Sequence, residues 1–177
     1  NQQDVLSAHS LVNTYEEEAL RQVFWQYGEL RTAPVLAKTI IQARQIAPID
    51  TTFDLKTVLK KYLPQGRENK ILAQIYQAIR IEVNQEIEVL KAFLLQTPSL
   101  LKTDGRLSII SYHSLEDRLV KRFIRNGLFE GEPEKDVFGN FEVPLKKVGG
   151  LIVPTSAEIK SNNRARSAKL RIAKKVN

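Results

Sequence analysis

Hydrophobic residues in the first half of the chain recur three and four positions apart, which is the spacing of helices that bury one face. A stripe from Leu20 to Tyr27 predicts one such helix, with Thr14 and Glu17 as a capping box before it and Gly28 after its last turn. The first half of the chain is therefore expected to be helical.

Three more helices are expected in this half. Thr32 and Pro34 suit the start of one helix, and Thr52 can cap the next. Residues 68–97 carry one continuous apolar stripe, which predicts a single long helix that Pro98 stops. We interpret these stripes as the core of a helical bundle and not as a groove for a cofactor or partner.

Strands alternate with helices in the second half. The apolar run Leu107, Ile109 and Ile110 has too little alternation for a half-exposed strand, so residues 107–112 are expected to be covered on both faces, as in a parallel sheet. Further along, the pattern predicts a helix over 115–126, a loop or small hairpin over 128–144, a strand at 151–153, a short helix from residue 155 or 156, and a last strand over 168–172.

Chemically capable side chains follow the first of these strands directly. Ser111, His113 and Ser114 lie at its end, where open α/β sheets build their sites. Three strands make a poor open sheet, however, and the eight glycines supply neither a G-x-G-x-x-G turn nor a P-loop. If this is a nucleotide-binding type of fold, its cofactor-binding half is missing from the chain.

Charge is distributed unevenly along the chain. The net charge is +7, and residues 160–177 carry seven Lys and Arg without any Asp or Glu, which accounts for the whole excess. In the last strand Leu170 and Ile172 alternate with Lys169 and Arg171, so one apolar and one basic face are expected. A concentrated basic segment attracts nucleic acid, and the alternative is a merely solvated basic tail.

Composition narrows the class of protein. Hydrophobic residues make up 42% and charged residues 27%, as in a soluble globular chain, and no apolar run has the length of a membrane span. The chain has no cysteine, which suits the cytoplasm, and its two histidines, His9 and His113, lie far apart, so no metal site is expected. It begins with Asn1 and contains no methionine, which indicates a trimmed fragment or a processed product.

Three sequence blocks resemble one family. Residues 105–118, GRLSIISYHSLEDR, are similar to the G-R-L-x-V-I-S-[FY]-H-S-L-E-D-R signature of the bacterial 16S rRNA cytosine-N4 methyltransferases. Residues 76–86 are similar to that family's F-Q-A-L-R-I-x-V-N-x-E helix, with Tyr76 in place of Phe. Residues 163–171 are similar to its N-P-R-A-R-S-A-K-L-R segment, with Asn163 in place of the usual Pro. The blocks occur in the family's order, and the resemblance covers nearly the whole chain.

The resemblance implies a fold class and a domain organisation. The fold would be α/β, with an α-helical insertion domain for substrate recognition over residues 1–98. Residues 99–177 would form the C-terminal part of a Rossmann-like methyltransferase sheet, whose last strand is antiparallel. The family's S-adenosylmethionine-binding first half has no counterpart here. The cofactor would therefore be bound mainly by that absent half, and no cofactor-binding residue is expected in this chain.

The resemblance also implies the chemistry. The family transfers a methyl group from S-adenosylmethionine to the exocyclic amine of a cytidine, a poor nucleophile that needs positioning and hydrogen-bond acceptors for its N–H groups. Ser111, His113 and Ser114 could supply those acceptors, and His113 could take the proton. The alternative is that His113 and Ser114 only shape the turn and cap the next helix.

The expected partner is 16S rRNA or the small ribosomal subunit. The candidates for contacts with RNA are Arg164, Arg166, Lys169, Arg171, Arg118, Arg80 and Asn84, of which the last two share a helix face. For each of these side chains, surface charge or a contact inside the protein is the alternative.

Two functions remain open at this point. One is a part of an rRNA methyltransferase that is inactive without its cofactor-binding half. The other is an RNA-binding or ribosome-assembly module without chemistry of its own. A cytoplasmic protein without membrane contact is expected in both cases. The unpaired edge of the strand over 107–112 would invite pairing with another copy, so a homo-oligomer, or looseness in residues 99–177, is expected for the fragment.

Overall fold

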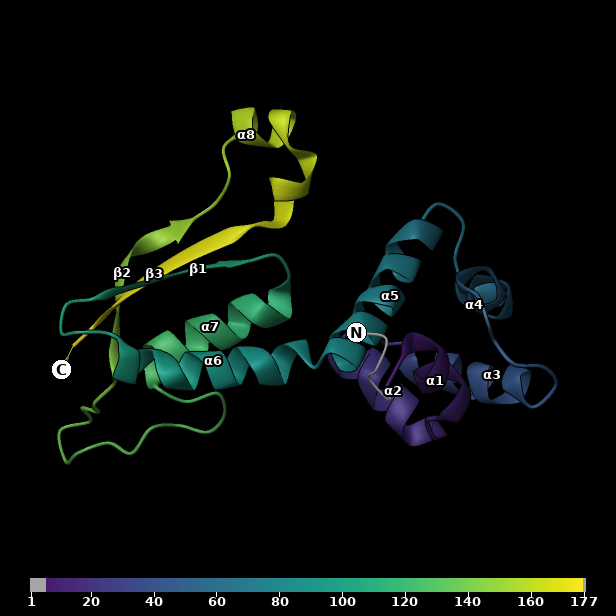
Figure 1. The fold of residues 1–177 in the computed structure, drawn as a ribbon, viewed down its shortest axis with the longest axis horizontal. Helices are drawn as coiled ribbons and strands as arrows, with labels where there is room; N and C mark the ends of the chain where they lie inside the picture. The colour runs from purple at the N-terminus through teal and green to yellow at the C-terminus, as the bar shows by residue number, and fades with distance from the viewer. Residues whose placement is uncertain (1–5, 177) are drawn as a thin grey trace. The chain divides into compact units, whose positions relative to one another are not determined.

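The computed structural model describes residues 6–176, and its internal contacts separate them into two units (Figure 1). The first unit ends at Glu86 and contains only helices. The second unit begins at Ile87 and combines helices with one three-stranded sheet. The mixed α/β class expected from the sequence is thereby confirmed.

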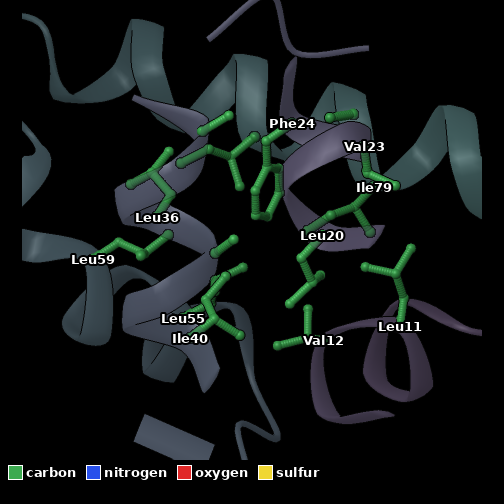
Figure 2. Packing of buried hydrophobic residues seen from close by; sticks show 14 of the residues in the cluster. Leu11, Val12, Leu20, Val23, Phe24, Leu36, Ile40, Leu55, Leu59 and Ile79 are labelled. Carbon is green, nitrogen blue, oxygen red and sulfur yellow. The ribbon is translucent and has the colours of Figure 1, made fainter. Parts of the chain in front are cut away.

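The first unit is a bundle around one hydrophobic core. Its elements are α1 (Ala8–Thr14), α2 (Glu17–Gln26), α3 (Ala33–Arg44), α4 (Thr52–Leu59), a 3₁₀ turn (Lys60–Tyr62) and α5 (Glu68–Asn84). Figure 2 shows Leu11, Phe24 and Leu36, from three different helices, directed into this core. All three side chains are fully buried, which confirms that the apolar stripes form core.

The expected capping box between Thr14 and Glu17 is wrong. Thr14 is the last residue of α1, and its hydroxyl donates to the carbonyl of Ser10 within that helix at 2.7 Å. The box lies at the start of α1 instead, between Ser7 and Ser10, and α2 begins after Glu16 without a side-chain cap. Serine paired with serine satisfies the same two backbone donors as the usual pairing with glutamate.

The starts of α3 and α4 follow the sequence signals closely. Thr32 is the N-cap residue of α3, and Pro34 occupies its first turn, as expected. In α4 the cap is Thr51 and not Thr52, since the Thr51 side chain accepts from the backbone N–H of Asp54 and the Asp54 carboxylate accepts from Thr51. The prediction was therefore displaced by one residue.

Residues 68–97 do not form a single helix. The chain breaks at Gln85, which has a left-handed φ of 51°, and a new helix, α6 (Glu86–Leu100), begins there. Neither glycine nor proline marks this break in the sequence. The compact units also divide here, so α6 from Ile87 onward packs with the second unit. A domain boundary after residue 98, which the family resemblance implies, remains a prediction.

Pro98 lies inside α6 and does not stop it. A proline at this position cannot donate to the carbonyl four residues earlier, which belongs to Leu94. The hydroxyl of the buried Thr97 donates to that same carbonyl at 2.7 Å and replaces the missing bond. This local compensation explains why the helix continues to Leu100.

The sheet of the second unit has the strand order β1-β3-β2. Its strands are β1 (Arg106–Ser111), β2 (Leu145–Ile152) and β3 (Lys169–Lys175). The last strand in sequence is central and antiparallel to both neighbours, as the family resemblance implied. Consequently β1 and β2 run in the same direction without touching, and β1 has no parallel partner among the described residues.

One face of this sheet is covered by α7 (Ser114–Asn126). Val120 and Phe123 of this helix share a hydrophobic cluster with Leu94 of α6, Leu145 and Ala173. The opposite face is open among the described residues, where Ile110 and Ile152 are 56% and 50% exposed. The expectation that the first strand is covered on both faces is therefore not met within this chain, because α7 covers only one face.

A short helical excursion joins β2 to β3. It consists of α8 (Ser156–Ser161) and a 3₁₀ turn (Asn163–Ser167), and Figure 1 shows it projecting beyond the ends of the strands. None of the helices within residues 6–176 combines the length and the apolar character needed to cross a bilayer.

Candidate functional site

The turn between β1 and α7 is built around His113. His113 is the N-cap residue of α7, and its Nδ1 accepts from the backbone N–H of Glu116 at 3.4 Å. The Glu116 carboxylate accepts in return from the backbone N–H groups of Tyr112, at 2.8 Å, and His113, at 3.3 Å. Histidine thus takes the place of the usual serine or threonine in a capping box. The alternative that His113 caps the helix is correct as a description of its contacts.

This cap decides which imidazole nitrogen is available for chemistry. Because Nδ1 accepts a hydrogen bond, the neutral ring carries its proton on Nε2. Nε2 lies 3.4 Å from Glu116 Oε1, and only 9% of the His113 side chain is exposed. In this tautomer Nε2 is the donor of the ring and faces the Glu116 carboxylate, and Nδ1 is the ring nitrogen that can take up a further proton.

The two serines of the turn occupy different environments. Ser111 ends β1, is only 1% exposed, and its hydroxyl has no hydrogen-bond partner among the described residues. Ser114 is the first residue of α7 and is half-buried. A buried hydroxyl without a partner is costly, so Ser111 is the residue of this turn that most needs an additional polar contact.

Lys169 and Arg171, expected at the RNA surface, instead face α7. The Arg171 guanidinium donates from Nε and from a terminal nitrogen to the two oxygens of Asp117, at 2.7 and 3.0 Å. Lys169 Nζ lies 3.4 Å from the same carboxylate. The hydrogen bond from Arg171 lowers the pKa of the Asp117 carboxyl, and this effect exceeds the opposing effect of burial.

Apolar and basic residues alternate along β3 as expected. The basic face, however, is turned towards α7, and the apolar face is turned towards the open side of the sheet. Arg171 and Ala173 point to the covered face, where Ala173 is fully buried, and Leu170 and Ile172 point to the open face. A basic side chain can point inward here because Asp117 of α7 supplies the counter-charge. The sequence did not predict this pair, because Asp117 lies 54 residues before Arg171 along the chain.

Arg164 and Arg166, unlike Lys169 and Arg171, are exposed. Both belong to the 3₁₀ turn after α8, and Ala165 between them is buried and anchors the turn. The Asn162 side chain accepts from the backbone N–H of Arg164 at 3.1 Å and fixes the start of the turn. Arg118, on the first turns of α7, is also exposed.

Arg80 and Asn84 share one face at the end of α5, as predicted. Arg80 donates to both carboxylate oxygens of Glu86, at 2.8 and 3.0 Å, and Asn84 donates to Glu86 at 3.1 Å. These bonds bridge the break at Gln85 between α5 and α6. A structural role is thus visible for both residues, and contact with RNA remains a prediction.

A cavity of about 680 Å³ in the second unit was not anticipated from the sequence. Its lining includes Lys121 and Arg125 on α7 and Lys146 and Lys147 on β2. The sequence contained two signals for it, a pair of bases four residues apart on one helix and two adjacent lysines at a strand start. Neither signal could be joined to the other before α7 and β2 were placed side by side.

Comparison with known proteins identifies the family. The model of the MraW methylase family matches residues 1–176. The chain belongs to this family. It is 66% identical over 176 residues to a protein of Christiangramia forsetii named ribosomal RNA small subunit methyltransferase H, and 66% identical over the same length to a protein of that name from Flavobacterium johnsoniae. A Cytophaga hutchinsonii protein of the same name is 50% identical over 169 residues.

The matches cover nearly the whole chain but only part of each relative. For the first two relatives they include 99% of this chain and 58% of the other protein. The chain therefore spans a little over half the length of the curated relatives that it matches. The turn around His113 and the short helical excursion with Arg164 and Arg166 both lie within the matched region.

Proposed function

We propose that the complete protein carrying this chain transfers a methyl group from S-adenosylmethionine to the N4 amine of a cytidine in the rRNA of the small ribosomal subunit. The observation that carries this proposal is the family match over residues 1–176. The relatives' name, which includes a small-subunit rRNA methyltransferase activity, supports the substrate class. The cytidine amine rests on the resemblance of residues 105–118 to the family signature.

The residues of this chain do not fit a whole site for S-adenosylmethionine. The turn after β1 is closed by the reciprocal cap of His113 and Glu116, which leaves no glycine-rich loop whose N–H groups could approach a cofactor. When bound, the cofactor supplies an electrophilic methyl group. We assign most of its contacts to the part of the complete protein that this chain does not span. The open edge of β1 and the open face beside Ile110 would meet that part.

The turn residues of this chain would bind the cytidine amine, which is the nucleophile of the reaction. In this proposal Ser111 and Ser114 accept hydrogen bonds from the cytidine amine, which must lose a proton during or after transfer. His113 would receive that proton at Nδ1, the acceptor nitrogen of the neutral ring, once the backbone N–H of Glu116 releases it, and the Nε2–H group would stay beside the Glu116 carboxylate. The target base would have to leave its stack to reach this turn.

A pair of substitutions separates catalysis by His113 from its capping role. His113→Asn keeps an N-cap acceptor but removes the titratable ring, and His113→Ala removes both. In the complete protein we expect both variants to lower kcat, with little change in the dissociation constant for S-adenosylmethionine. If His113→Asn retained the wild-type kcat and only His113→Ala lost activity, the residue would be a cap and not a base.

RNA binding is assigned first to Arg164 and Arg166. Lys169 and Arg171 are already bound to Asp117, so fewer than four phosphate contacts should come from this segment. With about two contacts, Arg164→Glu with Arg166→Glu should reduce the slope of log K against log salt by about 1.4, using ~0.7 for each contact with a single strand. An unchanged slope would reject this assignment.

The helical unit would recognise the substrate as an insertion domain, with Arg80 and Asn84 as further RNA candidates. A non-catalytic RNA-binding module is the competing function, and the exposed arginines after α8 would suit either function. Calorimetry separates them. The 177-residue chain should not bind S-adenosylmethionine measurably, and the complete protein should bind it and methylate rRNA. Tight cofactor binding by this chain by itself would refute the division of roles.

A further inference from the structure

The cavity of about 680 Å³ is the feature of the second unit that the proposed reaction does not use. It lies between the C-terminal half of α7, the segment before β2, and strands β2 and β3. Its apolar lining includes Ile124, Val143 and Leu145, and Phe141 adds an aromatic ring that is 36% exposed. Pockets of roughly 300–1,000 Å³ with a mainly apolar lining are the usual size and kind for small organic ligands or their parts.

The rim of this cavity is basic. Lys121, Arg125, Lys146 and Lys147 line it and are exposed. Within residues 6–176, Lys121, Lys146 and Lys147 form no ion pair, unlike Arg171, whose charge is satisfied by Asp117. Four exposed cations around an apolar pocket suit a ligand that combines a flat apolar body with negative charge.

We propose that this cavity holds one unpaired nucleotide of the RNA substrate, with its base on Phe141 and its flanking phosphates at the lysine rim. The inference rests on the proposed function and adds a second RNA contact to it. Sequence-tolerant binding of single strands commonly joins an aromatic platform to a basic groove in this way. The lysines provide the phosphate contacts, and the apolar wall replaces the stacking lost when the base leaves its neighbours.

Glu142 gives this cavity a preference among bases. It is the acidic residue in the lining as the structure describes it, next to Phe141. A carboxylate accepts a hydrogen bond from the N4 amine of cytosine, whereas the O4 oxygen of uracil would face it with a second acceptor. The cavity should therefore favour cytosine over uracil.

The nucleotide in this cavity cannot be the one that is methylated. Lys121 and Arg125 lie seven and eleven residues after Ser114 along α7, which is about 10 to 16 Å at ~1.5 Å per residue. The cavity also lies beside β2, at the sheet edge opposite β1. A strand added by the rest of the protein at β1 would leave the cavity open. The cavity is therefore a positioning contact for RNA outside the reaction centre.

Binding of labelled oligonucleotides by the complete protein tests the proposal. The probes are ten-nucleotide oligo(rC) and oligo(rU), measured by fluorescence anisotropy over a range of salt. We expect oligo(rC) to bind more tightly than oligo(rU), and Glu142→Gln to reduce this difference. Phe141→Ala should weaken oligo(rC) binding by about tenfold through lost stacking. The matched control Phe138→Ala removes a phenylalanine that is 86% exposed outside the lining, and should change affinity little.

Variants that remove charge from exposed lysines provide a second test, because these substitutions leave the hydrophobic core of the protein unchanged. Lys146→Gln with Lys147→Gln should reduce the salt slope by about 1.4, at ~0.7 for each lost phosphate contact. Lys102→Gln with Lys135→Gln removes the same charge from exposed positions outside the cavity. Equal effects of the two double variants, or equal effects of Phe141→Ala and Phe138→Ala, would overturn the proposal.

Methylation by the same variants distinguishes this inference from the proposed function. If the complete wild-type protein methylates rRNA but the cavity variants match their controls, only the cavity assignment fails. If the wild-type protein does not methylate rRNA, the proposed function fails. Cross-linking with an oligonucleotide that carries 5-iodocytidine should label a peptide that contains Phe141, and labelling confined to residues 163–172 would contradict the cavity.

Discussion

The guanidinium of Arg171 in β3 holds both carboxylate oxygens of Asp117 in α7, at 2.7 and 3.0 Å. Asp117 is 7% exposed, and the Arg171 side chain is 14% exposed, so the pair lies almost entirely out of water. Asp117 lies one turn after the His113 cap. The pair therefore fixes the helix that carries the candidate catalytic turn to the central strand of the sheet.

Asp117→Asn should destabilise the second unit. The substitution leaves the buried Arg171 guanidinium without its counter-charge, and losing one partner of such a pair typically costs about 3–5 kcal/mol. Urea unfolding followed by far-UV circular dichroism measures the change. Asp104→Asn is the matched control, because Asp104 pairs with Lys174 of the same strand but is exposed, and it should change stability little. Equal losses would show that burial of the pair is unimportant.

The same carboxyl predicts an acid-dependent loss of stability. The pKa of Asp117 is lowered in the folded chain, chiefly by the hydrogen bond from Arg171. Its stabilising contribution is therefore fully present above the unfolded pKa of about 3.9 and is lost as pH falls through the lower folded pKa. Unfolding free energy should fall more steeply below about pH 4 in the wild type than in Asp117→Asn. Parallel curves for the two proteins would contradict this.

Thr97 and Pro98 should be energetically coupled. Thr97→Val leaves the Leu94 carbonyl without its hydroxyl donor and should cost about 1–3 kcal/mol, as for an unsatisfied buried acceptor. Pro98→Ala restores a backbone N–H that can reach the same carbonyl, so Thr97→Val should cost less in that background. A double-mutant cycle by urea denaturation gives the coupling. Additive effects would mean that the hydroxyl does not replace the backbone bond.

Gln85→Gly should stabilise the first unit. Gln85 has a φ of 51°, and a left-handed conformation costs a non-glycine residue about 1 kcal/mol. Glycine removes this strain, whereas Gln85→Ala retains it and serves as the control. Trp25 lies in the first unit, so its fluorescence can follow urea unfolding there. A lower midpoint for Gln85→Gly than for Gln85→Ala would show that the break does not depend on this conformation.

Local signals in the sequence predicted much of the secondary structure because they act between near neighbours. The helix expected over residues 115–126 ends at Asn126 as predicted, and Gly127 after it adopts a left-handed φ of 71°. Thr32 and Pro34 marked the start of α3. The break at Gln85 was missed since glutamine is an ordinary helix residue, and nothing local shows that it leaves the helical conformation.

The candidate site divides in the same way. Residues 105–118 by themselves indicated a strand, a polar turn and a helix, and their resemblance to one family agrees with the family match. The sequence could not show that His113 caps α7 through Nδ1, because a ring orientation depends on its surroundings. It also could not show which carboxylate forms the ion pair with Arg171, since Asp117 lies 54 residues away along the chain.

Hydrophobic periodicity, the location of positive charge and the family signature were thus determined by the sequence, since each depends on the order of residues alone. The tertiary structure decided which side of β3 is buried, which Lys and Arg side chains form ion pairs with Asp117, and which of them surround the cavity beside Phe141. These are properties of residues brought together from α7, β2 and β3. Ion pairs and pockets depend on distances in space between residues that lie far apart in the chain. These distances are set only when the chain folds and its strands pair.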